Sequence, residues 1–274
     1  MIKQENDFPV ILESYFTKHL SFERNFSENT YNTYLIVIKQ YLKYLSSIKN
    51  VKPKNISIYS FSKQNILDFL QYVEKELKCT VKTRNHKLTI INSFLEYAQS
   101  INPIYLDIYL KSKSIKQKKS KKEKMDFLTR EELEIFMKSI NIKSKSGYKH
   151  YVLIALLYEA GLRVSELINL KVSNLFFLNE SPYIKVLGKG NKERIVYLNS
   201  DIVSIVNEYM DKFKISNGYL FLNHSDEKYT RFGINKIVSK YYELSKKECL
   251  TLVNKNITPH SFRHSKAVHL LMNN

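Results

Sequence analysis

Apolar residues recur at helical spacing through most of the first hundred positions of the chain. Similar stripes lie at residues 8–20, after Ser62, and over residues 83–99. The clearest stripe follows Ser27, an N-cap residue type, and comprises Tyr31, Tyr34, Leu35, Ile38, Tyr41, Leu42 and Leu45. This pattern predicts a small four-helix domain over residues 1–110.

The pattern changes beyond residue 125. Thr129 and Glu132 form a capping-box pair at the start of a helix, and an apolar stretch ends at Gly161, where glycine can stop a helix. A hairpin is expected where two β-prone runs flank a glycine-rich turn. The chain is therefore predicted to be mainly α-helical with a small antiparallel β-sheet, in two domains, the second over residues 126–274. Its expected helices and strands cover residues 130–140, 148–160, a short helix from Val164, strands 183–187 and 193–198, and helices 200–213, 230–247 and from Pro259 onward.

The 274 residues carry 44 Lys and Arg against 26 Asp and Glu, a formal net charge of +18. A charge this large repels itself in a folded protein and is usually tolerated because the protein binds a polyanion. The hydrophobic content of 43% argues against disorder, and the distant Cys79 and Cys249 exclude a disulfide framework or a cysteine zinc site. Neither a signal peptide nor a membrane-spanning run is recognisable, so we expect a cytoplasmic, nucleoid-associated protein.

Eight lysines and one glutamate fall between residues 111 and 124. Such a run repels itself and predicts a solvated, flexible linker over residues 111–125. A merely soluble loop would look the same, but contact with a phosphate backbone is favoured because the run lies between two globular segments. The linker lysines expected to make this contact are Lys116, Lys118, Lys119, Lys121 and Lys122.

A second basic cluster opens the third predicted helix and comprises Lys82, Thr83, Arg84 and Lys87. The N-terminal end of a helix is electrically positive, so this cluster suits a contact with a DNA phosphate. A solvated helix start fits the same residues, and both interpretations stay open.

Three separated segments hold residues suited to phosphate chemistry. Taken singly, each has an ordinary explanation, because Arg163 and Glu166 can pair on a helix surface and Lys189 can be a solvated loop lysine. The segments read GLRVSEL at 161–167, GKGNKER at 188–194 and PHSFRH at 259–264.

Histidines raise the question of a metal. His260 and His264 stand four residues apart, and His269 follows on the same predicted helix. No acid or cysteine accompanies them, so we expect no metal site. The hypothesis of a metal-dependent nuclease that uses these three histidines is therefore disfavoured.

Together the three segments suit one task, which is to hold a phosphodiester while it is attacked. Arg163 and Arg263 can each bond two oxygens and would clamp the phosphate between them. His260 lies one helical turn before Arg263 and could donate a hydrogen bond or transfer a proton. Lys189 at the hairpin tip could protonate the leaving oxygen. No metal or cofactor is required.

In order and wording these segments resemble the tyrosine recombinases, the phage integrase family that includes the Xer-like recombinases. The resemblance covers essentially the whole chain. It implies an N-terminal helical, SAM-like core-binding domain and a catalytic domain that together clamp double-stranded DNA. Members cleave through a 3′-phosphotyrosyl link without a cofactor and work as a tetramer on DNA. The implied roles are stabilisation of the phosphorane by Arg163 and Arg263, acid–base work by His260, protonation of the 5′-hydroxyl by Lys189, and orientation by Glu166.

The family also places its nucleophilic tyrosine after the helix that carries the HxxR motif. All 20 tyrosines of this chain precede Arg263, and the nearest, Tyr241 and Tyr242, have the spacing of core residues. We therefore expect a C-terminally shortened recombinase that lacks its nucleophile. The complete protein is expected to work as a tetramer on DNA, and for this form a monomer is considered. The alternative is a cleavage-defective DNA-binding module that occupies or regulates a recombination site.

Overall fold

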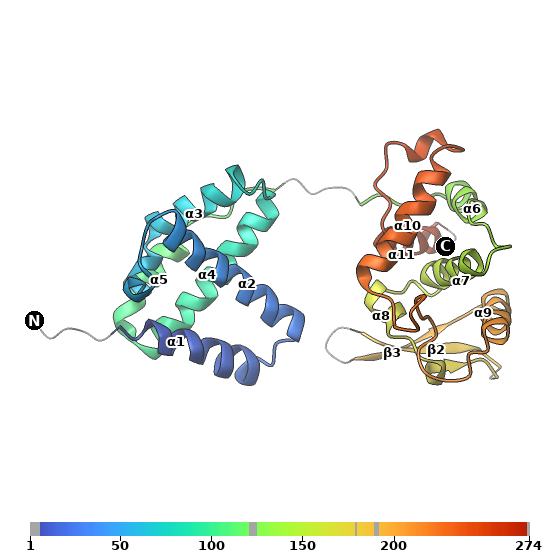
Figure 1. Cartoon of the computed structure of the whole chain (residues 1–274), viewed down its shortest axis with the longest axis horizontal. Coiled ribbons are helices and arrows are strands. Elements are labelled where there is room, and N and C mark those ends of the chain that lie inside the picture. Colours follow the sequence, from blue (N-terminus) through green and yellow to red (C-terminus); the bar gives the residue numbers. More distant parts are fainter. Residues whose placement is uncertain (1–5, 121–124, 179, 189–191, 273–274) are drawn as a thin grey trace, which may run out of the picture. The chain divides into compact units, whose positions relative to one another are not determined.

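A computed structural model of the protein describes residues 6–120, 125–178, 180–188 and 192–272. The chain divides into two compact units, Met1–Lys122 (unit 1) and Glu123–Asn274 (unit 2). Both are mainly helical, and unit 2 also contains a three-stranded antiparallel sheet, which confirms the predicted fold class (Figure 1). None of the helices in the described residues is long and apolar enough to span a membrane.

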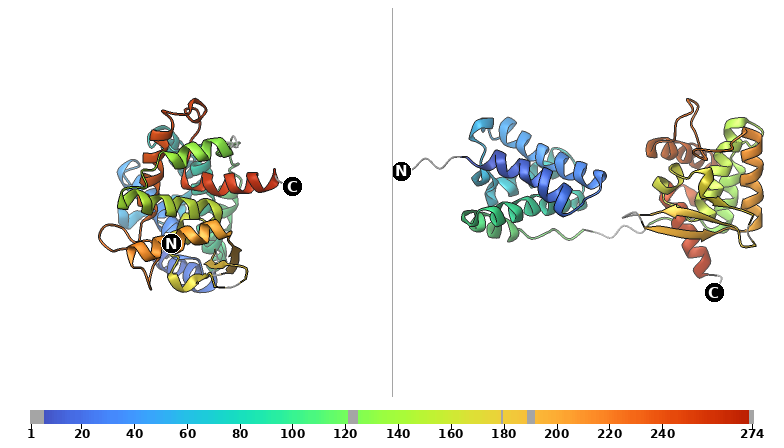
Figure 2. Two further views of the ribbon diagram at one scale, coloured as in Figure 1. Left: turned by 90° about the vertical axis from the view of Figure 1, so that its right-hand side faces the viewer. Right: turned by 90° about the horizontal axis from the view of Figure 1, so that it is seen from below.

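Unit 1 is a bundle of helices around an apolar core (Figures 1 and 2). Tyr41, Phe69 and Phe94 from three of its helices are fully buried. Ser62 caps a helix as predicted, because its hydroxyl accepts the Asn65 backbone N–H at 3.3 Å. The helices are α1 (Phe8–Ser14), the π-helical segment Tyr15–Glu23, α2 (Glu28–Ser47), α3 (Lys63–Lys75), α4 (Val81–Ile101) and α5 (Leu106–Lys113).

Two details of unit 1 differ from the predicted helices. Residues 8–20 do not form one α-helix, since α1 continues as a π-helix from Tyr15 to Glu23. Buried Ile11, Tyr15 and Leu20 follow one another at four- to five-residue steps, a spacing that the wider π-helical turn accommodates. The third helix begins earlier than predicted, because Thr80 caps it and residues 82 and 83 lie in its first turn.

The lysine-rich run is not a free linker from residue 111. Helix α5 extends to Lys113, with Ser112 fully buried. Ile115 is also buried, because this apolar residue joins the core of unit 1. The run up to Ile115 thus belongs to the folded part of unit 1, although its lysine content predicted a solvated linker.

Unit 2 is built around α7 (Lys145–Glu159), which packs against both α9 and α11. Its residues 152–157 have almost no exposed surface, as expected of a helix enclosed by others. The helix stops at Gly161, whose φ of +54° is the left-handed conformation predicted there. The surrounding helices are α6 (Arg130–Lys138), α8 (Val164–Ile168), α9 (Ser200–Phe213), α10 (Arg231–Ser245) and α11 (Pro259–Leu271).

The sheet of unit 2 contains the predicted hairpin. Strand β2 (Tyr183–Leu187) pairs antiparallel with β3 (Glu193–Tyr197), and the short β1 (Leu175–Phe176) pairs with the other edge of β2. Figures 1 and 2 show β2 and β3 as a long two-stranded ribbon. Alternation along β3 turns Arg194 and Val196 inward, whereas Tyr197 is exposed on the opposite face.

Candidate active site

Arg163 and Glu166 are joined at the start of α8. The Arg163 backbone N–H donates to Glu166 Oε2 at 2.7 Å, and the Arg163 Nη1 donates to Glu166 Oε1 at 2.9 Å. The Glu166 side chain is only 2% exposed, while that of Arg163 is 47% exposed. The ion pair considered from the sequence therefore exists, but its carboxylate lies inside the protein and the guanidinium group extends to the surface.

Arg194 completes this cluster and received no role in the sequence analysis. Its Nη1 and Nη2 atoms donate to Glu166 Oε1 and Oε2 at 2.7 and 2.8 Å, a bidentate fork from strand β3. Burial alone would raise the pKa of Glu166, but the hydrogen bonds from Arg194 and Arg163 outweigh it and lower that pKa to about 2. The alternation of β3 in the sequence could have shown that the Arg194 side chain points inward. It could not have shown that Glu166 is the partner of Arg194.

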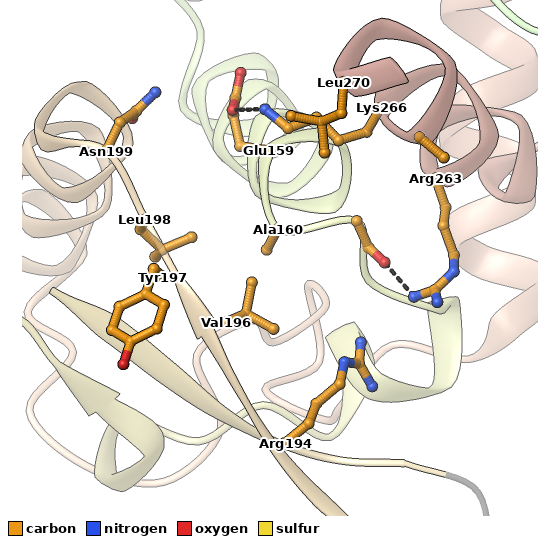
Figure 3. A pocket seen from close by; sticks show the side chains of 12 residues that line it. Glu159, Ala160, Arg194, Val196, Tyr197, Leu198, Asn199, Arg263, Lys266 and Leu270 are labelled. Atoms are coloured by element: carbon orange, nitrogen blue, oxygen red, sulfur yellow. Dashed lines mark hydrogen bonds and ion pairs between the residues drawn. The ribbon is translucent and has the colours of Figure 1, made fainter. Parts of the chain in front are cut away.

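Arg263 of α11 lies beside the same cluster. Its Nη1 donates to the backbone carbonyl of Gly161, two residues before Arg163 (Figure 3). Burial lowers the pKa of Arg263, as do the positive charges of Arg163 and Arg194, while Glu166 opposes this shift. Three guanidinium groups from distant parts of the sequence thus converge around one carboxylate.

A cavity of about 480 Å³ opens beside these residues (Figure 3). Arg194 and Arg263 contribute charge to it, and Val196 and Leu270 are among its apolar lining residues. Lys266 also lines it, but its Nζ pairs with Glu159 at 2.6 Å. The cavity therefore offers an anion two guanidinium groups that are not fully neutralised, next to an apolar wall.

Of the other two predicted catalytic residues, the structure describes only His260. His260 is exposed in the first turn of α11, one turn before Arg263, so both residues lie on one side of that helix. Lys189 lies outside the described residues. Gly188, directly before it, has its amide bonded to the Lys192 carbonyl at 2.8 Å, which closes the base of the hairpin.

The two further histidines of α11 have structural contacts. His264 packs edge-on against Phe127, and the Nδ1 of buried His269 hydrogen-bonds with the Tyr158 hydroxyl at 2.8 Å. Among the described residues there is no group of three or more His, Cys, Asp or Glu side chains arranged to hold a metal ion.

The basic cluster at the start of α4 is divided by burial. Lys82 and Thr83 are exposed, but Arg84 and Lys87 are only 4% and 6% exposed. Lys87 donates to Gln40, and Arg84 bonds with Asn85 and with the Lys116 carbonyl, so neither side chain is presented to DNA in this conformation. The expectation that all four contact phosphate is therefore corrected for these two.

Three of the predicted linker lysines are exposed, and one of them, Lys118, also has a partner. Lys118 pairs with Glu74 at 2.7 Å, and its backbone N–H and carbonyl both bond with the Asn85 side chain. Lys116 and Lys119 are exposed as well. Lys121 and Lys122 lie outside the described residues.

No tyrosine considered as a nucleophile is placed for attack. Tyr241 and Tyr242 are 3% and 6% exposed, and their hydroxyls bond with the His150 ring and with the Leu252 carbonyl. Tyr197 lines the cavity, but its hydroxyl points away from Arg194 and Arg263 (Figure 3). The interpretation of Tyr241 and Tyr242 as structural residues agrees with this burial.

Comparisons with known proteins show the family of this chain. Residues 126–274, more than half of the chain, match the phage integrase family, and residues 12–101 match the N-terminal SAM-like domain of phage integrases. The tyrosine recombinase XerD of Staphylococcus haemolyticus is 29% identical over 96% of this chain and 85% of its own length. The tyrosine recombinase XerC of Leptospira interrogans is also 29% identical, over 93% of this chain and 78% of its own.

Solved structures show the same fold. The XerH site-specific recombinase bound to its palindromic difH substrate superimposes with a TM-score of 0.69 at 23% identity, covering 91% of this chain and 71% of that one. The Tn1549 transposon integrase in complex with circular intermediate DNA gives a TM-score of 0.69 at 18% identity, over 95% and 86%. A lambda integrase tetramer bound to a Holliday junction gives 0.67 at 16% identity. With its SAM-like domain, its integrase domain and its arginine cluster, the chain belongs to the phage integrase family of tyrosine recombinases.

Proposed function

We propose that this protein breaks and rejoins double-stranded DNA at a specific site and that the arginine cluster beside its cavity holds the phosphate to be cleaved. The convergence of Arg163, Arg194 and Arg263 around Glu166 is the single observation that carries the proposal. A pentavalent phosphorane has more negative charge than the starting diester. Guanidinium groups that the fold already holds in place therefore stabilise the transition state more than the ground state.

Each residue has a defined part in the proposed reaction. A tyrosine oxygen forms a bond to phosphorus while the bond from phosphorus to the 5′-oxygen breaks. Arg163 and Arg263 bind the non-bridging oxygens, and Lys189 gives its proton to the leaving 5′-oxygen. His260 accepts the proton of the tyrosine or donates a hydrogen bond to the phosphate. The phosphotyrosyl link conserves the energy of the broken bond, so rejoining needs no cofactor.

The two units are proposed to share the duplex. The core-binding domain, predicted over residues 1–110, is proposed to extend to Ile115, which packs in its core, with the linker over residues 116–125 and the catalytic domain over 126–274. Exposed Lys82, Lys116 and Lys119 would contact the phosphate backbone. By analogy with the lambda integrase tetramer on its junction, the active assembly would contain four copies on DNA.

The nucleophile is proposed to lie outside the 274 residues. Burial of Tyr241 and Tyr242 and the outward direction of the Tyr197 hydroxyl support this. The test compares the 274-residue chain with the product of the same gene read through every codon that follows Asn274. Each is incubated with a nicked target duplex and examined for a protein–DNA adduct that survives denaturation. An adduct with the longer form alone supports the proposal, whereas no adduct with either contradicts the cleavage activity.

A cleavage-defective DNA-binding module is the second candidate. It is favoured by the observation that an arginine cluster suited to a phosphate is assembled while the hydroxyls of Tyr241 and Tyr242 are engaged by His150 and Leu252. Tight, strongly salt-dependent DNA binding without strand scission by the longest gene product would establish it. Binding that does not weaken with salt would contradict both candidates.

A further inference from the structure

Arg194 binds both oxygens of the Glu166 carboxylate. It gives one hydrogen bond to each oxygen, at 2.7 and 2.8 Å, while Arg163 gives a single side-chain bond at 2.9 Å. An arginine and a carboxylate pair best as two parallel bonds, and here Arg194 occupies that geometry. The carboxylate therefore takes only one of the side-chain donors of Arg163, and that side chain is 47% exposed.

Without Arg194 the buried carboxylate would need another partner. Glu166 is 2% exposed, and an unpaired charge at such a position is costly. Arg163 is already bonded to it and is the group that could turn to form the bidentate fork. That turn would use the donors that the proposed reaction needs for the phosphate.

The same pair lies at the base of the hairpin. A β-carbon built on Gly188 would be 3.6 Å from Arg194 Nη1 and 3.8 Å from Glu166 Oε1, so the backbone before Lys189 packs directly on the ion pair. Arg194 itself belongs to β3, the second strand of that hairpin. The contact thus fixes the hairpin base to the start of α8, where Arg163 lies.

We propose that Arg194 is a positioning residue that acts through Glu166: it occupies the carboxylate so that Arg163 remains free for the phosphate, and it anchors the hairpin beside the site. This inference rests on the proposed function. Three guanidinium groups against one carboxylate also leave two positive charges, which suit a phosphorane better than a diester.

The test measures binding to one phosphate and needs no cleavage. Duplexes bound by the 274-residue chain are selected from a random pool, and single neutral methylphosphonates are then scanned along the selected duplex. In the unaltered protein we expect one position at which neutralisation weakens binding about tenfold more than at its neighbours, the size of a lost charge-assisted contact. The ratio of the two affinities reports the phosphate clamp, because a general loss of folding or of DNA affinity changes both terms equally.

Arg194→Ala is expected to reduce this ratio to about twofold or less, since Arg163 turns to Glu166. Arg194→Lys keeps the charge but loses the fork, so its ratio should be intermediate. Glu166→Gln should reduce the ratio as well, and the Arg194→Ala/Glu166→Gln double variant should be no worse than either single one. Lys185→Ala, which removes a positive charge from the other face of the same sheet, is the matched control and should keep the full ratio.

Two outcomes overturn the inference. Arg194→Ala and Arg194→Lys with the unaltered ratio would show that Arg194 has no part in the clamp. Arg194→Ala with a reduced ratio but Glu166→Gln with an increased one would show that Arg194 binds the phosphate itself. The proposed function itself fails if no duplex is selected, or if Arg163→Ala and Arg263→Ala leave the ratio unchanged. These outcomes differ from those that overturn the role of Arg194, so the two failures can be told apart.

Discussion

Arg263 donates a hydrogen bond to the carbonyl of Gly161, and this bond joins the end of α7 to α11 just before Arg163. Two arginines one hundred positions apart in the sequence are thereby brought close enough for the charge of Arg163 to act on Arg263. The glycine is suited to this place because its left-handed φ of +54° turns the chain sharply between the helix and Arg163.

Gly161→Ala tests that turn. Nothing lies within 4 Å of a β-carbon at this position, so the cost is backbone strain alone, about 1 kcal/mol in the free energy of unfolding. Gly218→Ala is the matched control, since it has a φ of +73° and equally open space. Urea unfolding should show similar destabilisation of both variants, but only Gly161→Ala should weaken binding to the clamped phosphate. Equal phosphate binding by the two variants would contradict the link to Arg263.

Glu166→Gln should lower stability in a pH-dependent way. The carboxyl has a pKa of about 2 in the folded protein against 4.5 for the free group, so the folded state favours the ionised form. Its contribution, about 2–3 kcal/mol, is fully present above pH 4.5 and is lost as the pH falls toward 2. Urea unfolding at pH 7 and at pH 3.5 should therefore show the gap between variant and parent narrowing in acid. A constant gap would indicate that packing rather than charge explains the loss.

Arg163→Ala and Arg263→Ala should separate chemistry from binding. In a form of the protein that forms the covalent adduct, each substitution is expected to slow cleavage by about 10²–10³-fold, because a donor to the transition state is lost. The dissociation constant for a duplex of unaltered chemistry should change much less. Single-turnover cleavage and gel-shift titration measure the two quantities. Equal losses in both would mean that these arginines only hold the DNA.

Replacing Lys116 and Lys119 by alanine should weaken binding to all duplexes alike. Each lost phosphate contact reduces the slope of log affinity against log salt by roughly 0.9. Lys111→Ala is the control within the same run, since Lys111 is paired with Asp107 at 2.7 Å on α5. Its slope should match that of the unaltered chain, and an equal reduction there would mean that only overall charge matters.

Asn85→Ala should release the chain after α5. The Asn85 amide donates to the Lys118 carbonyl at 2.8 Å and accepts the Lys118 N–H at 3.1 Å. Loss of both bonds is expected to reduce the free energy of unfolding of unit 1 by about 1–2 kcal/mol and to remove exchange protection of the Lys118 amide. His86→Ala, an exposed change on the same helix, should do neither. Unchanged protection at Lys118 in Asn85→Ala would show that other contacts hold this segment.

Local sequence signals predicted most of the fold. The capping box of Thr129 and Glu132 and the helix stop at Gly161 both lie where the residue types placed them. The hairpin of β2 and β3 follows from a change of period around a glycine-rich turn. Each of these features depends on residues only a few positions apart, and the conformational preferences of such short stretches are well defined.

Contacts between distant residues were predicted less well. The lysine run was expected to be a linker throughout, yet Ser112 and Ile115 are buried because α4 and the preceding helices cover them. Arg84 and Lys87 have basic sequence neighbours, but the bundle encloses both. Composition describes the average exposure of a residue type, whereas the packing of other elements decides the exposure of each one.

Most of the helices, the hairpin and the residue types able to bind a phosphate could be predicted from the sequence, because each depends on spacing along the chain or on the chemistry of one side chain. The bidentate bond of Arg194 to the Glu166 carboxylate and the 47% exposure of the Arg163 side chain could not be predicted in this way. A buried carboxylate pairs with whichever cations the fold brings to it, and Arg194 reaches Glu166 from strand β3, 28 positions along the chain, through the packing of the sheet beside α8.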